Sequence, residues 1–192
     1  FTTATDTFNT AVGHAAGLSV TTGVRNTLIG GLAGDAFTDA DYNVAVGYAA
    51  LSQDTLGSKS TALGYNALNT QNFTTATDTY NVAVGMSAGE AVTTGISNVL
   101  IGGLAGDALT DADQNVAVGT SALGADTLGG TSVAIGNNAL STQNFTTATS
   151  TYNVAVGYDA GVSVTTGVGN TLLGGLAGDA LTDADFNVAI GK

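Results

Sequence analysis

Three sets of aspartates are the residues whose type and spacing most suggest a chemical site. Each set places three carboxylates within seven residues, and the sets recur at intervals of 72 residues. Their members are Asp35, Asp39 and Asp41; Asp107, Asp111 and Asp113; and Asp179, Asp183 and Asp185. Because Ca²⁺ prefers carboxylate and carbonyl oxygens as ligands, the pattern predicts calcium sites, the one cofactor that the sequence suggests. The alternative is that these aspartates are solvated turn residues without a bound ion.

Two further motifs suggest modification or catalysis. Asn72 and Asn144 each begin an Asn-Phe-Thr triplet within a Thr-rich stretch, which matches the N-glycosylation pattern. Few side chains are suited to catalysis, because the chain has no Cys and a single histidine, His14. The equivalents of His14, 72 and 144 residues later, are Met86 and Tyr158. We therefore expect a protein that is not an enzyme.

The net charge of the chain argues against nucleic-acid binding. Arg25, Lys59 and Lys192 are the only basic residues against 15 acidic ones, which gives a net charge of −12. Such a chain repels a phosphate backbone, so nucleic acid is not expected as a partner. No stretch approaches the ~20 consecutive apolar residues of a membrane-spanning helix.

The elements that must position these residues form an internal repeat. A short motif, Asn-x-Ala-Val-Gly or a close variant, occurs eleven times, with its glycine at positions 13, 30, 47, 64, 85, 102, 119, 136, 157, 174 and 191. Three 17-residue units and one 21-residue unit make a block of 72. The whole chain, 1–192, is thus one continuous array, with blocks 9–80 and 81–152, a partial block 153–192, and residues 1–8 as the tail of a preceding block. Since neither end carries an atypical capping unit, we expect the segment to belong to a longer array.

The repeat predicts an all-β parallel β-solenoid, or β-roll, of about eleven coils. Short Val-Ala-Val runs that end in Gly are typical of strands entering a turn, and 28 glycines disfavour helices. Such strands bury their faces only by stacking on identical coils, about 4.8 Å apart.

Side-chain alternation divides each strand into two faces. The column Val12, Ile29, Val46, Leu63, Val84 and Ile101 is expected to form the inner core, opposite an alanine eight residues into every unit (Ala16, Ala33, Ala50, Ala67 and Ala88). The alternate column of Ala11, Leu28, Ala45, Ala62, Ala83 and Leu100 is then the outer face. Because that column is also apolar, we expect it to pack against another copy of the chain, side by side, in an oligomer or bundle. The alternative is an Ala-rich face in water.

The repeated N-x-A-[VIL]-G-x-x-A motif resembles the head repeats of trimeric autotransporter adhesins (YadA-like heads) and similar repeats in phage tail-fibre proteins. The resemblance covers essentially the whole chain. It implies a left-handed β-roll, three chains packed side by side through their small-residue strand faces, and a role in attachment at a cell or virion surface, with surface glycans or a host-cell receptor as partners.

Three other columns are assigned by their spacing. The Asn column (Asn9, Asn26, Asn43, then Ser60) is expected to form a hydrogen-bonded ladder. Aromatic residues directly before the motif Asn and directly after its Gly are expected to cover strand edges or fill a seam between chains, with sugar stacking as the alternative. An ice-binding solenoid is a further alternative, because threonines also form a column, at Thr21, Thr38, Thr55, Thr93, Thr110 and Thr127.

The function that best fits these features is a non-enzymatic extracellular structural repeat protein, which forms a fibre or the shaft of an adhesin or tail fibre by side-by-side or end-to-end assembly of its copies. Two alternatives remain: the ice-binding solenoid and a hexapeptide-repeat-like acyltransferase. The second rests on a six-residue step in the first unit of a block and lacks a recurring histidine base.

Overall fold

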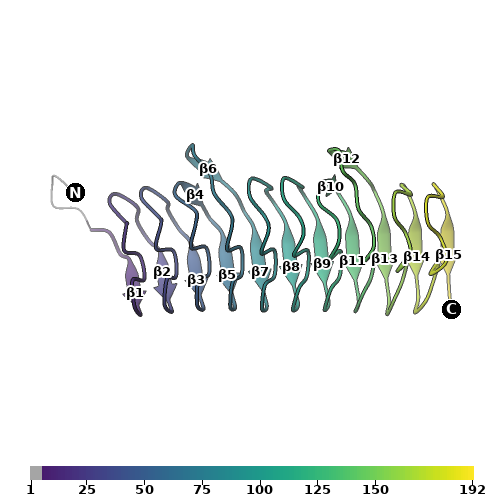
Figure 1. The fold of residues 1–192 in the computed structure, drawn as a ribbon, viewed down its shortest axis with the longest axis horizontal. Helices are drawn as coiled ribbons and strands as arrows, with labels where there is room; N and C mark the ends of the chain where they lie inside the picture. The colour runs from purple at the N-terminus through teal and green to yellow at the C-terminus, as the bar shows by residue number, and fades with distance from the viewer. Residues whose placement is uncertain (1–5) are drawn as a thin grey trace.

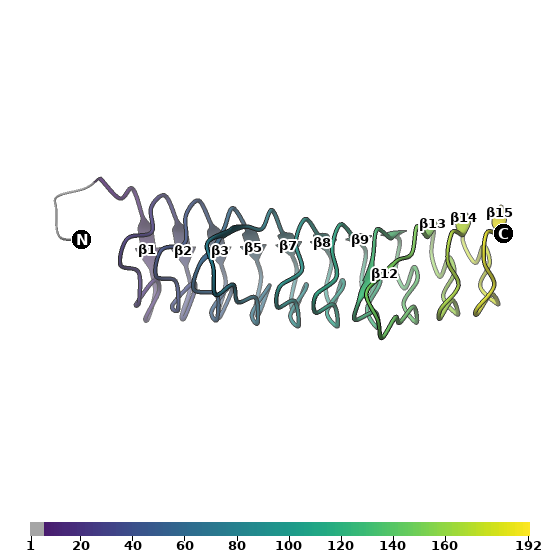
Figure 2. The same ribbon diagram turned by 90° about the horizontal axis from the view of Figure 1, so that it is seen from above.

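A stack of parallel coils runs through the computed structural model, which describes residues 6–192 (Figure 1). Each coil contributes one three-residue strand to an 11-stranded parallel sheet, so the predicted β-solenoid of about eleven coils is confirmed. The strands lie along one side of the stack and the turns of each coil along the other (Figure 2). Within the described part of the chain, no helix is long and apolar enough to cross a membrane.

The large sheet is built from strands of equal length. They are β1 (Thr10–Val12), β2 (Thr27–Ile29), β3 (Val44–Val46), β5 (Thr61–Leu63), β7 (Val82–Val84), β8 (Val99–Ile101), β9 (Val116–Val118), β11 (Val133–Ile135), β13 (Val154–Val156), β14 (Thr171–Leu173) and β15 (Val188–Ile190). Every strand pairs with the next in the register that the repeat dictates. For example, Thr27, Leu28 and Ile29 lie beside Val44, Ala45 and Val46.

The four extra residues of each long unit make a loop that projects from the stack. Two small parallel sheets form at the bases of these loops, β4 (Gly57–Ser58) with β6 (Thr77–Asp78) and β10 (Gly129–Gly130) with β12 (Thr149–Ser150). Both loops emerge at the same edge, one block apart (Figure 1). The expected third copy, at residues 1–8, lies partly outside the described residues.

The motif glycine is required by how closely neighbouring coils approach. At Gly102 the backbone φ is +135°, a conformation that side chains rarely allow, and a Cβ there would lie 2.5 Å from the carbonyl oxygen of Gly119 in the next coil. The same clash, at 2.2–2.5 Å, occurs at each motif glycine from Gly13 to Gly174. Coils therefore stack backbone on backbone at this position.

The predicted assignment of inner and outer strand faces is wrong. The column of alanines and leucines is buried, with Ala45, Ala62, Ala83 and Leu100 fully inaccessible, whereas Val12 is 57% and Leu63 45% exposed. The strand pattern grouped the right residues on each face, but both faces are apolar, so the pattern did not say which one is interior.

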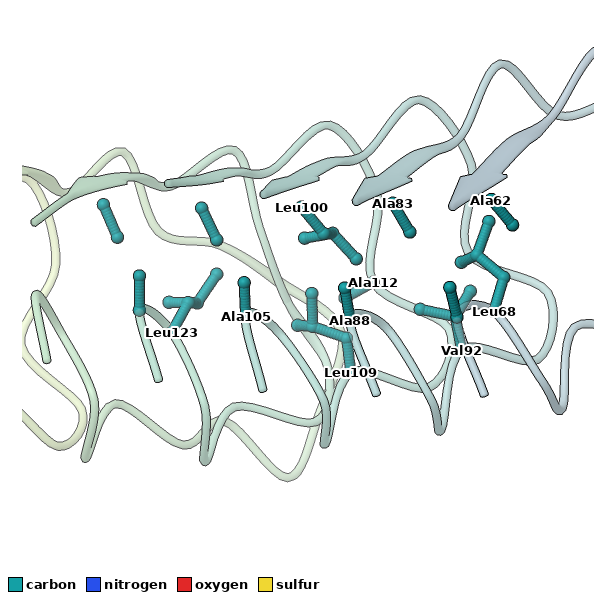
Figure 3. Close-up of a cluster of buried hydrophobic side chains, with 14 of the residues drawn as sticks. Ala62, Leu68, Ala83, Ala88, Val92, Leu100, Ala105, Leu109, Ala112 and Leu123 are labelled. Atoms are coloured by element: carbon teal, nitrogen blue, oxygen red, sulfur yellow. The ribbon is translucent and has the colours of Figure 1, made fainter. Parts of the chain in front are cut away.

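Small and large side chains compensate each other across the interior (Figure 3). Where the strand residue is Leu100, the facing residues are Gly89 and Gly106, and a Cβ on either would lie 2.7 Å from a Leu100 methyl carbon. Where the strand residue is alanine, as at Ala117 and Ala134, the residue six positions later is a buried leucine, Leu123 or Leu140. The predicted alanine column on the opposite wall is confirmed, since Ala33, Ala50, Ala67 and Ala88 are all fully buried.

The asparagine ladder also forms, although the backbone supplies its donors. The side-chain oxygen of Asn26 accepts a hydrogen bond from the backbone N–H of Asn43 in the next coil, at 2.9 Å. The amide nitrogen of Asn26 donates to the carbonyl of Ala40 at 2.7 Å. Asn98 repeats both contacts with Asn115 and Ala112. Each of these buried asparagines thus bonds to the turn of its own coil and to the backbone of the next coil.

The glycine contact generates a matched test. We expect Gly102→Ala to lower the free energy of unfolding by about 2–4 kcal/mol, through backbone strain and the clash with the next coil. The control is Gly103→Ala, because a Cβ on the adjacent Gly103 meets nothing within 4 Å. Thermal and urea unfolding followed by circular dichroism measure both variants. Equal stabilities for the two variants would contradict the close stacking.

Candidate functional site

The predicted calcium ligands are hydrogen-bond acceptors between the first two coils of each block. The carboxylate Oδ1 of Asp41 accepts from the backbone N–H of Val24 at 2.7 Å, and Asp113 accepts from Ile96 at 2.7 Å. Asp39 accepts from the hydroxyl of Thr22 at 2.5 Å. Asp111 and Asp185 make the corresponding contacts to Thr94 and Val168, and Asp183 accepts from Thr182. Apart from Asp183, whose partner is the adjacent residue, these aspartates tie the turn of the second coil to that of the first.

The first aspartate of each set lies elsewhere on its coil. Asp35 has one carboxylate oxygen buried without a partner among the described residues, and burial raises its pKa. Burial also raises the pKa of Asp107, with a smaller contribution from the nearby charge of Glu90. Asp179, the third member, is exposed. Within residues 6–192, no three His, Cys, Asp or Glu side chains come together in a group that could hold a metal ion, so calcium binding stays a prediction without a ligand cage.

A buried polar cluster, which the sequence analysis did not single out, fills the interior of the third and fourth coils. Asp126 is fully buried, and its Oδ1 accepts from the backbone N–H groups of Gly129 and Phe145, both at 3.0 Å. Its Oδ2 accepts from the side-chain nitrogen of Gln143 at 2.6 Å, and Gln143 in turn accepts from Asn153 at 2.8 Å. The signal in the sequence was the Asp-Thr-Leu-Gly run, present at both 54–57 and 126–129.

This cluster explains why the asparagine column contains a serine in every fourth coil. Ser132 stands in the column, and its hydroxyl contacts Gln143 at 2.9 Å and Thr151. Ser60 makes the same contacts to Gln71 and Thr79 in the first block. The glutamine amide comes from the longer coil and bonds both to this serine and to the asparagine of the next coil. Insertion, serine and buried aspartate therefore form one structural unit.

The glycosylation candidates lie at the start of the projecting loops. Asn72 and Asn144 are exposed, and their side-chain oxygens accept hydrogen bonds from Thr55 and Thr127 at 3.3 Å and 3.1 Å. Glycosylation at these residues stays a prediction.

Aromatic and basic residues before the motif Asn stack along the coil axis. The Arg25 guanidinium lies 5.7 Å from the ring centre of Phe8 and 5.2 Å from that of Tyr42, and Lys59 lies 5.3 Å from the ring of Tyr80. After the motif Gly, the rings of Tyr48 and Tyr65 stack at 5.8 Å. These aromatic side chains nevertheless stay exposed, from 47% at Tyr42 to 66% at Phe8, so sugar stacking stays an alternative.

The threonine column and His14 complete the predicted residues. The hydroxyls of Thr21, Thr38, Thr93 and Thr110 donate to backbone carbonyls of the next coil at 3.0–3.2 Å. Thr55 and Thr127 donate to the carbonyls of Phe73 and Phe145. This column therefore stabilises the stack and does not present a row of free hydroxyls. His14 is exposed on the first coil.

No known protein family, curated protein or solved structure matches the chain. The resemblance to adhesin heads and tail-fibre repeats accordingly stays a prediction.

The buried cluster generates a stability prediction. All three hydrogen bonds at Asp126 use its oxygens as acceptors, and both oxygens are used. In Asp126→Asn, the side-chain NH2 group would therefore face an N–H donor in either orientation of the amide. We expect a loss of about 1–3 kcal/mol in the free energy of unfolding. The control is Asp183→Asn at an exposed turn, where little change is expected. Denaturant unfolding measures both, and an unaffected Asp126→Asn protein would contradict the assigned network.

The raised pKa of Asp107 generates a pH prediction. Because its pKa is raised above the ordinary 3.8, the folded state binds the proton more tightly than the unfolded state, and the ionised carboxylate destabilises the fold at neutral pH. We expect Asp107→Asn to stabilise the protein at pH 7, with the gain disappearing as the pH falls through the raised pKa to below 3.8. Thermal unfolding across pH measures this, with exposed Asp179→Asn as control. A gain that persists at the acid end would contradict the assignment.

Proposed function

We propose that the chain is a non-enzymatic, extracellular structural repeat protein, a segment of a fibre or of the shaft or head of an adhesin or tail fibre, whose copies assemble side by side. The observation that carries the proposal is the outer face of the large sheet. That face is regular and mostly apolar, and its side chains are partly or fully exposed in every strand.

The polar side chains argue for a structural role. Aspartates, asparagines and threonines of the repeat form hydrogen bonds with the neighbouring coil. In this arrangement each repeat adds length and internal cohesion, which is what a fibre requires.

The exposed face consists of two columns of mostly β-branched residues. Its most exposed members in the described strands include Val12, Ile29, Val44, Leu63, Ile101, Ile135, Val188 and Ile190, which are 36–75% exposed. Eleven rungs at about 4.8 Å make a strip about 50 Å long and roughly 10–20 Å wide. Its area, roughly 500–1,000 Å² on each partner, is comparable with the ~800 Å² per partner of a stable protein interface.

The periodicity of this face favours a second copy of the same chain as its partner. Side chains that repeat at every rung form ridges and grooves with the spacing of the sheet. Another array with the same spacing stays in register over all eleven rungs, whereas a surface with a different spacing matches only a few. A self-complementary face of this kind is also the basis of symmetric assemblies.

The net negative charge opposes assembly and makes it depend on salt concentration. Copies that each carry a net charge of −12 repel one another, and salt screens that repulsion. We expect side-by-side association to strengthen as ionic strength rises, the reverse of what an interface held by ion pairs shows.

The proposal is tested by charging the face. We expect Val84→Lys with Val118→Lys to convert the assembly to monomers, because both residues lie in the central strands β7 and β9 and a buried lysine without a partner is strongly disfavoured. Analytical ultracentrifugation at low and high salt measures association, and circular dichroism verifies that the coils remain folded.

The control adds the same charge elsewhere. Thr75→Lys with Thr147→Lys changes the exposed tips of the two loops and should leave assembly unchanged. An unmodified protein that stays monomeric at high concentration and high salt would contradict the proposal, as would assembly that survives the two lysines on the face.

A further inference from the structure

The second block contains a surface hollow, and several of the residues that line it differ from their equivalents in the first block. It measures about 240 Å³ and lies beside β10 and β12, at the edge where the loops project and away from the strands of the large sheet (Figure 1). Its walls include Asp111, Asp113, Leu128, Thr131, Ala148 and Ser150. None of these residues belongs to the exposed face proposed for assembly.

The equivalent residues of the first block, 72 positions earlier, include an ion pair. Lys59, the counterpart of Thr131, places its ammonium 2.5 Å from a carboxylate oxygen of Asp78, the counterpart of Ser150. The Ser58 hydroxyl accepts a hydrogen bond from the backbone N–H of Asp41 at 2.9 Å. In the second block Gly130 replaces that serine and offers the N–H of Asp113 no hydroxyl. Three polar groups are thus removed together, and the removal of both lysine and aspartate leaves the local charge unchanged.

The groups that remain can bind hydroxyls. Asp111 and Asp113 each use Oδ1 in a bond to the preceding coil, which leaves Oδ2 of each as an acceptor. The backbone N–H of Asp113 is a donor as well; its equivalent in the first block, the N–H of Asp41, donates to the Ser58 hydroxyl. The side chains of Leu128 and Ala148 add an apolar surface beside these polar groups.

From this arrangement we infer that the hollow binds one sugar residue of an uncharged glycan. A ring of this size presents hydroxyls to the aspartates and to the Asp113 N–H, and its C–H face to Leu128 and Ala148. Acidic sugars are disfavoured by the two carboxylates and by the net charge of −12. A shallow site with few contacts is expected to be weak, with a Kd on the order of 1 mM, so that affinity for a surface would come from repeated copies.

Saturation-transfer NMR with the unmodified protein tests the inference, because it detects weak ligands on proteins of any size. The probes are the methyl glycosides of glucose, galactose and N-acetylglucosamine, with glucuronate as an acidic sugar and propylammonium as a simple amine. We expect transfer to at least one neutral glycoside, and none to glucuronate.

The decisive variant is T131K/S150D, which installs the residues of the first block and should fold, because the same coil accommodates them 72 residues earlier. It is expected to reduce transfer at least tenfold. T75K/A76D adds the same charges to the loop of the first block and should leave transfer unchanged. The inference is overturned if no neutral glycoside receives saturation, if T131K/S150D still binds it, or if propylammonium or glucuronate binds more strongly than every neutral glycoside.

Discussion

The close approach of one coil's backbone to the next is the constraint on which the rest of this structure depends. At the motif glycines the separation leaves no room for a Cβ, and beside them the asparagine side chain reaches the backbone of the adjacent coil. Together these contacts fix both the distance between rungs and their register. Once the register is fixed, every side chain repeats as a column, and the properties of the molecule are properties of its columns.

Within that fixed register, the four coils of a block are not equivalent. The first two coils have an apolar interior in which leucine on one wall faces glycine on the other. The third and fourth also have buried leucines and alanines, and add to them a buried polar cluster centred on Asp54 or Asp126 and on the glutamine of the longer coil. The acidic turn of the second coil accepts hydrogen bonds from the first. Each coil therefore matches its own neighbours, and the 72-residue block is the unit of this structure.

The sequence predicted the architecture because the repeat alone requires it. Eleven equally marked segments, each too short to fold alone, could pair only with one another, and the register followed from aligning their glycines. The alanine column opposite the strands was likewise predictable, since Ala33 and Ala50 stand at a fixed place in every unit. The choice of interior was not, because both faces of Val44-Ala45-Val46 are apolar.

The chemistry was harder to predict than the fold. Asp35, Asp39 and Asp41 are close in sequence, yet the turn sends their carboxylates to different neighbours, and spacing alone could not show this. The buried Asp126 was missed because an aspartate inside a thin coil is exceptional, and its partner Gln143 lies in another unit. The hollow of the second block could not be predicted, because its walls come from three successive coils.

Distances between spin labels test the stack most directly, and the absence of cysteine from the sequence makes the labelling simple. Thr22, Thr94 and Thr166 are exposed and occupy the same place in successive blocks, four coils apart. With rungs about 4.8 Å apart, pulsed electron spin resonance should give about 19 Å between labels at 22 and 94, and about 38 Å between labels at 22 and 166. Distances that do not grow in proportion to the number of coils would contradict the account.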